Sequence, residues 1–142
     1  GAISRLLDFG VEPYLVSSSL ICVLAQRLVR RICPDCKQAY DPPAHELRDL
    51  GLMEHENPTF YIGTGCAKCF DTGYRGRTGI YELMTLNEDI REMIYGQTTA
   101  GAIKKKALEL GMQTLRMDGA RKAKEGLTTI AEVLRVTQSD NV

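Results

Sequence analysis

The chain has 142 residues and no long hydrophobic run, since no apolar stretch approaches the ~20 residues that cross a membrane as a helix. Its N-terminus has no cationic segment followed by an apolar one, so no signal peptide is predicted. A net charge is also missing, because 18 basic and 18 acidic residues balance. A dedicated nucleic-acid-binding protein is usually basic. We therefore expect an ordinary soluble protein without a nucleic-acid partner.

The common catalytic motifs are missing as well. The sequence has no G-x-x-x-x-G-K-[ST] loop to hold nucleotide phosphates, no G-x-G-x-x-G between a strand and a helix, and no G-x-S-x-G nucleophile elbow. The two histidines, His45 and His55, form no H-E-x-x-H pair, and we expect both to be exposed to solvent. The sequence therefore predicts no enzymatic activity for this chain alone.

Cysteine, in contrast, is present in an informative pattern. Two C-x-x-C pairs, Cys33-Pro34-Asp35-Cys36 and Cys66-Ala67-Lys68-Cys69, supply four sulfur atoms. Four thiolates form a complete tetrahedral ligand set for Zn²⁺ and leave no open position for water or substrate. The pattern therefore favours a structural zinc site formed by Cys33, Cys36, Cys66 and Cys69. Disulfide bonds, an iron–sulfur cluster or a redox-active dithiol are the alternatives.

The fifth cysteine, Cys22, lies in an apolar run from Leu20 to Ala25, and we expect it to be a small buried hydrophobic side chain. An odd number of cysteines without a secretory signal is typical of the reducing cytosol. The segment 33–72 that holds the two pairs has three basic and seven acidic residues. This excess of acidic residues disfavours binding of the segment to the phosphate backbone of a nucleic acid.

The sequence predicts mostly helices. A first helix over 2–9 ends at Gly10, and a long helix runs from Pro13 to about Arg31 with apolar residues on more than one face. Nothing before this long helix could cover it, and the chain opens at Gly1 within a helical pattern. We therefore expect the chain to be a piece of a larger domain.

Shorter elements are predicted after Cys36. They are a helix over 41–50, a strand over 60–62, a strand around 78–83, helices over 87–96, 98–111 and 115–125, and a last helix that begins with a capping box of Thr129 and Glu132. The tail from Gln138 is expected to fray.

Several arginines are candidates for contact with a phosphate group. Arg27, Arg30 and Arg31 would share one face of the predicted long helix. Arg75 and Arg77 alternate in an extended, glycine-rich segment. An arginine in such a loop at a subunit boundary could neutralise a transferring phosphate, and Arg77 is the best candidate for this role in trans. The alternative for Arg77 is a salt bridge to an acid such as Glu82.

Several segments together carry a resemblance to a known family. They are 2–8, 11–20 and 24–31, the two cysteine pairs, Gly73-Tyr74-Arg75-Gly76-Arg77-Thr78-Gly79-Ile80-Tyr81-Glu82-Leu83, and 126–137. As a set they resemble the assembly ATPases of type II secretion and type IV pili, the GspE/PulE/PilB group, and the resemblance covers nearly the whole chain.

The resemblance implies a mainly α fold with a small β-hairpin, made of three parts. These are the closing helices of a RecA-like ATPase core (1–32), a tetracysteine zinc subdomain (33–72) and a C-terminal strand with a helical subdomain (73–142). The parent protein would be a homo-hexameric ATPase that uses ATP and Mg²⁺ in the cytoplasm, peripheral to the bacterial inner membrane. Its partners would be secretion or pilus platform proteins of that membrane.

The Walker A and Walker B segments of the family lie upstream of the matching region and are absent here, so no catalytic residue is carried over. A free-standing zinc-ribbon module that binds nucleic acid is the alternative hypothesis. It would need an exposed basic or aromatic surface near the cysteines.

Overall fold

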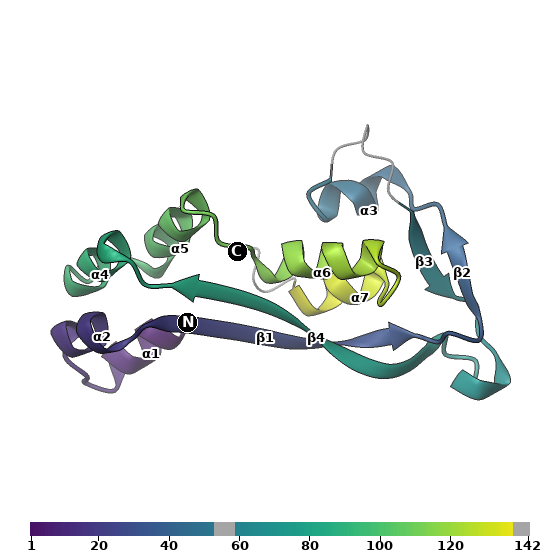
Figure 1. Ribbon diagram of the computed structural model, residues 1–142, viewed down its shortest axis with the longest axis horizontal. Coiled ribbons are helices and arrows are strands. Elements are labelled where there is room, and N and C mark those ends of the chain that lie inside the picture. The colour runs from purple at the N-terminus through teal and green to yellow at the C-terminus, as the bar shows by residue number, and fades with distance from the viewer. Residues whose placement is uncertain (53–58, 138–142) are drawn as a thin grey trace. The chain divides into compact units, whose positions relative to one another are not determined.

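The structure is a computed structural model that describes residues 1–52 and 59–137 (Figure 1). By their packing, the residues form two compact units. Unit 1 comprises Gly1–Ala25 and Glu82–Thr114, and unit 2 comprises Gln26–Tyr81 and Leu115–Val142. The division into 1–32, 33–72 and 73–142 stays a prediction. The predictions for His55 and for the tail from Gln138 fall outside the described residues.

The described residues form seven α-helices, one short 3₁₀ helix and two two-stranded sheets. The predicted helices after residue 40 are confirmed to within a few positions, but the strands are longer than a small hairpin. The elements are α1 (Ala2–Asp8), α2 (Pro13–Ser19), β1 (Cys22–Ile32), β2 (Lys37–Tyr40), α3 (Ala44–Asp49), β3 (Phe60–Gly63), η1 (Ala67–Cys69), β4 (Tyr74–Thr85), α4 (Glu88–Tyr95), α5 (Ala100–Glu109), α6 (Leu115–Lys124) and α7 (Ile130–Thr137).

The prediction of one long helix from Pro13 to Arg31 was wrong. Only α2 is helical, and β1 follows it and pairs with β4 (Figure 1). The apolar residues of this stretch include Ile21, Val23 and Val29, whose branched side chains suit a strand better than a helix. The partner strand of β1 comes only after the whole cysteine segment, so no local sequence pattern indicates that the two strands pair. Arg27, Arg30 and Arg31 therefore share no helix face.

The change from helix to strand also corrects the prediction for Cys22. Its side chain is exposed rather than buried. Successive residues of a strand point to opposite faces, and the alternation in β1 places Val23 and Ala25 at half-buried positions while Cys22 and Leu24 are exposed.

Unit 1 is held together by an apolar core between its helices. α2 packs against α4, and α4 packs against α5. The buried core residues are Val16, Leu86, Ile90, Ile94, Ile103 and Ala107. Asn87 caps α4: its side-chain oxygen accepts a hydrogen bond of 2.9 Å from the amide of Ile90.

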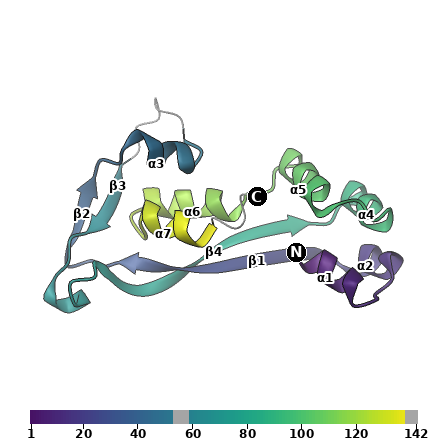
Figure 2. The same cartoon turned by 180° about the vertical axis from the view of Figure 1, so that it is seen from behind.

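In unit 2, α6 and α7 lie side by side in both views (Figures 1 and 2) and form a second core with residues of β3 and of the end of α3. Its buried residues are Leu50, Phe60, Ala120, Ala123, Ile130 and Val133. The helices approach closely at Gly119, where an added Cβ atom would lie 2.5 Å from a methyl group of Val133. The antiparallel pair β2–β3, with Lys37 opposite Gly63 and Tyr40 opposite Phe60, leads from one cysteine pair toward the other.

Among the described residues, no helix has both the length and the apolar character that crossing a membrane requires.

Candidate metal centre

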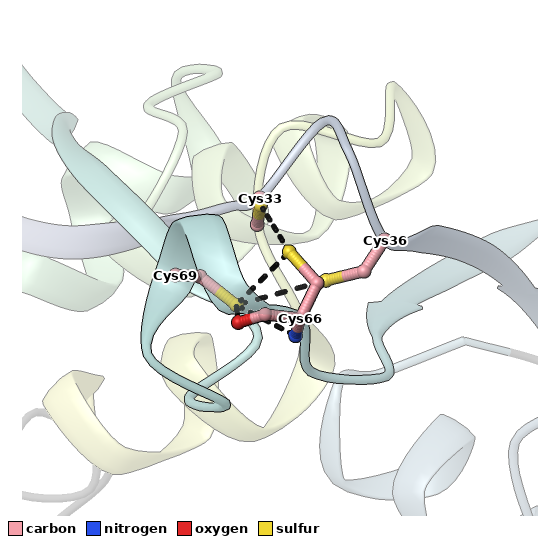
Figure 3. Close-up of side chains that lie close together, drawn as sticks. All are labelled: Cys33, Cys36, Cys66 and Cys69. Atoms are coloured by element: carbon pink, nitrogen blue, oxygen red, sulfur yellow. Dashed lines mark hydrogen bonds between the residues drawn. The ribbon is translucent and has the colours of Figure 1, made fainter.

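The four paired cysteines come from two chain segments that unit 2 brings together. Cys33 follows the last residue of β1, and Cys36 precedes the first residue of β2. Cys66 immediately precedes η1, and Cys69 is its last residue. Figure 3 shows the four side chains pointing toward one another. Cys33 and Cys69 are buried, whereas Cys36 and Cys66 are half-buried.

The distances between the sulfur atoms suit a tetrahedral metal ion. The Sγ atoms of Cys33 and Cys66 are 3.7 Å apart, those of Cys36 and Cys69 are 3.8 Å apart, and those of Cys66 and Cys69 are 3.7 Å apart. A tetrahedron with metal–sulfur bonds of about 2.3 Å has sulfur–sulfur edges of about 3.8 Å. A disulfide bond would need about 2.05 Å. The four thiols, which all lie within 4.8 Å of one another, could therefore hold a metal ion.

Backbone amides point at two of the sulfur atoms. The amide of Gly65 donates to Cys36 Sγ at 3.3 Å, and the amides of Cys66 and Gly73 donate to Cys69 Sγ at 3.3 and 3.2 Å. Such donors favour the thiolate, which is the form that binds metal. Burial opposes the charge on Cys69, but hydrogen bonds from the two amides and from the thiols of Cys66 and Cys36 outweigh it and lower the pKa of Cys69 to about 6. At Cys36 burial prevails and raises the pKa to about 11.

Two glycines let the cysteine segments approach. A Cβ atom on either Gly63 or Gly73 would collide with the backbone of the other. Gly73 also has a φ of +79°, which residues with side chains rarely adopt. Its carbonyl accepts a hydrogen bond of 3.0 Å from the amide of Cys33. Gly73 therefore links the first cysteine pair to the second.

Comparison with known proteins shows the family of the chain. The sequence model of the type II/IV secretion system protein family matches residues 1–135. The chain belongs to this family. It is 46% identical over 140 residues to the type II secretion system protein E of Pseudomonas aeruginosa, an alignment that covers 99% of this chain and 28% of that protein.

Both branches of the family include similar proteins. The chain is 43% identical over 138 residues to the type II secretion system ATPase E of Vibrio cholerae, covering 97% of the chain and 27% of that protein. It is 48% identical over 138 residues to the type IV pilus assembly ATPase PilB of Thermus thermophilus, covering 96% of the chain and 16% of that protein. The chain thus spans less than a third of the length of these relatives.

Sequence analysis missed a buried ionic cluster around Glu132 in the last family segment. Glu132 is only 1% exposed. Its carboxylate accepts hydrogen bonds from the amide and guanidinium of Arg30 at 2.8 to 3.1 Å, and from the guanidinium of Arg135 at 2.9 and 3.1 Å. The amide of Glu132 donates to Thr129 Oγ1 at 3.1 Å, which is the predicted first half of the capping box. Through its hydrogen bonds to Arg30, the carboxylate of Glu132 connects α7 to β1.

Neighbouring contacts strengthen this connection. The guanidinium of Arg30 lies 4.2 Å from the centre of the Tyr74 ring, and the Tyr74 hydroxyl is 2.8 Å from Thr129 Oγ1. Thr128 Oγ1 donates to the carbonyl of Arg30 at 2.8 Å. Arg30 is 102 positions from Glu132, so no local pattern connects the two residues. Only a correct prediction of β1 as a strand could have indicated this cluster.

The two arginines of the glycine-rich segment have different surroundings. Arg75 pairs with Asp35, between the first two cysteines, at 3.4 Å. Arg77 is exposed, and within residues 1–52 and 59–137 its side chain has no hydrogen bond or ion pair, with Glu82 or any other residue. The role of Arg77 in trans stays a prediction. His45 is exposed, as expected.

Proposed function

We propose that this chain is the C-terminal, zinc-binding portion of a hexameric ATPase that powers type II secretion or type IV pilus assembly. The observation that carries the proposal is the family match over residues 1–135, with relatives named as ATPases of both systems. The parent would bind ATP and Mg²⁺ through segments outside this chain. It would work in the cytoplasm and reach the bacterial inner membrane through platform proteins.

Within this proposal the metal is zinc, and its role is structural. An all-sulfur set at tetrahedral spacing supports zinc, and four protein ligands would leave no position for a substrate. The zinc would supply a rigid link between the end of β1 and the start of β4. The chain's own amides at Gly65, Cys66 and Gly73 would stabilise the charge of the thiolates.

The proposed link has a functional consequence for Arg77. Gly73 bonds to a cysteine of each pair and directly precedes β4, the strand that carries Arg77. A group that neutralises a phosphate in a neighbouring subunit must be held in position. We propose that the metal centre holds the strand that carries Arg77 against the subunit boundary of the hexamer.

A chimera tests the proposed function. The matching segment of the Pseudomonas aeruginosa protein is replaced by this chain, and secretion is measured in a strain that lacks its own copy. We expect the chimera to restore secretion. Cys33→Ser should abolish it and Cys22→Ser should not, because Cys22 is a free cysteine outside the cluster. A chimera that is stable and loaded with zinc but inactive would contradict the proposal.

A further inference from the structure

Phe70 occupies a backbone position that does not suit its side chain. It directly follows η1 and has a φ of +55° and a ψ of +39°, in the left-handed helical region. Helices commonly end on a residue in this region, but that residue is usually glycine, and a bulky side chain at positive φ is an outlier. The next residue, Asp71, also has a positive φ, of +60°. The turn therefore retains a strained phenylalanine where glycine would avoid the strain.

Packing does not explain the phenylalanine either. Phe70 is 89% exposed, the largest exposed fraction of any large apolar residue in 1–52 and 59–137. A ring that stays in water contributes little to a hydrophobic core. Strained residues are concentrated at functional sites, and a few aromatic side chains commonly supply most of the binding energy of a protein interface. Phe70 thus has the properties of an anchor for a partner rather than of a residue that the fold needs.

The turn that carries Phe70 is fixed by its own backbone. The amide of Asp71 donates to the carbonyl of Cys66 at 2.9 Å, and the amide of Thr72 donates to the carbonyl of Cys69 at 3.1 Å. These two hydrogen bonds close the turn around Phe70. A side chain on an ordered turn is positioned before a partner arrives, which lowers the entropy cost of association.

The charges beside Phe70 indicate the kind of partner. The two cations closest to it in the sequence, Lys68 and Arg75, both pair with Asp35, at 3.9 and 3.4 Å. Asp71 is exposed, and within the described part of the chain its carboxylate has no hydrogen bond or ion pair. These four charges sum to zero, so they give an anionic membrane no electrostatic attraction. The one charge without a partner is acidic, and a basic side chain would complement it.

We infer that Phe70 and Asp71 are the docking point for a different protein. The ring enters an apolar pocket of that protein, and the carboxylate pairs with a lysine or arginine at the rim of the pocket. The energy of the strained backbone is retained because the turn presents the ring outward. The inference goes beyond the proposed function, but its test in cells rests on it.

Removal of the ring from the purified 142-residue chain tests the strain. Phe70→Gly should raise the midpoint of thermal unfolding by about 2–4 °C, because glycine adopts a positive φ without strain and no packing is lost. Phe9→Gly is the matched control, since Phe9 is 85% exposed and also ends a helix, but its φ is −77°. The control should not raise the midpoint. A lower midpoint for Phe70→Gly would show that the ring supports the fold and would overturn the inference.

Cross-linking in cells tests the docking. The photoreactive analogue p-benzoylphenylalanine takes the place of Phe70 in the secretion chimera described above. Ultraviolet light should join it to one protein other than the chimera, at an apolar site beside a lysine or arginine. Asp71→Lys should lower the yield at least about tenfold, because it places two like charges together. Asp49→Lys, a charge reversal at another exposed acid of unit 2, should leave the yield unchanged.

Four results of the cross-linking would overturn the inference. They are no product at position 70, products with lipid only, products only within the chimera or with another copy of it, and a yield that Asp71→Lys leaves unchanged. A chimera that does not secrete but cross-links as expected would remove the proposed function and leave the docking point. A chimera that secretes equally well with Phe70→Gly would remove the docking point alone.

Discussion

The Glu132→Gln variant should destabilise unit 2 because it removes the charge at the centre of the buried cluster. Burial opposes that charge, but hydrogen bonds from Arg135 and Arg30 outweigh it and lower the pKa of Glu132 from 4.5 to about 2. A shift of this size corresponds to about 3 kcal/mol of folding free energy. Because the two arginine side chains are 47% and 59% exposed, water screens part of the interaction. We therefore expect a loss of about 2 kcal/mol at pH 7.

The effect should depend on pH in one direction. The folded state has the lower pKa, so the stabilisation is complete above the unfolded-state value of 4.5 and is lost as the pH falls toward about 2. The difference between the parent chain and Glu132→Gln should therefore be constant from pH 7 to about pH 5.5 and should shrink at pH 3.

Urea denaturation followed by circular dichroism at pH 7, 5 and 3 measures these differences, and a thermal scan should show a midpoint lowered by about 4–8 °C at pH 7. Glu125→Gln is the matched control, because Glu125 makes one exposed ion pair, with Arg121, at 2.9 Å. Its removal should cost no more than about 0.5 kcal/mol. A loss at Glu132 that is equally small, or that is unchanged between pH 7 and pH 3, would refute the account of this cluster.

Three further substitutions test other parts of the structure. Gly73→Ala should lower stability by about 2 kcal/mol or more, because its φ is positive and its Cβ atom would collide with Gly63; titration with a competing chelator should show weaker metal binding. Asn87→Ala should cost about 1 kcal/mol through the lost bond to the amide of Ile90, and unchanged urea denaturation would be contrary evidence. In a full-length relative, the substitution matching Arg77→Ala should slow ATP turnover at least about tenfold, and normal turnover in an assembled hexamer would assign Arg77 to structure.

The cysteine cluster and most helix ends could be predicted because their signals are local. A C-x-x-C pair turns its own two sulfur atoms toward one point, and Asn87 caps α4 through a residue three positions away. Gly10 and Gly51 adopt positive φ angles where helices were predicted to end. Within each cysteine pair and at each helix end the deciding contact lies within a few residues of the pattern, whereas the two pairs meet across 33 positions.

The strand β1 and the Glu132 cluster could not be predicted because their partners are distant. β1 pairs with β4 across the whole cysteine segment, and its apolar residues alone were also compatible with a helix buried on several sides. Glu132 matched a local capping box, but its carboxylate binds a residue of β1 that was itself assigned to the wrong element. One error in secondary structure therefore led to the wrong burial for Cys22 and the wrong shared face for the three arginines. The same error left the ionic cluster unpredicted.

The zinc content of the purified chain tests the central claim most directly. Native mass spectrometry should find one zinc ion per chain, which a strong chelator removes. Cys66→Ser should lack it, and Cys22→Ser should retain it. Because metal-binding energy here is folding energy, removal of the zinc should also expose the amides of residues 33–72 to hydrogen exchange. A metal-free chain whose amides in this segment stay fully protected would contradict the account.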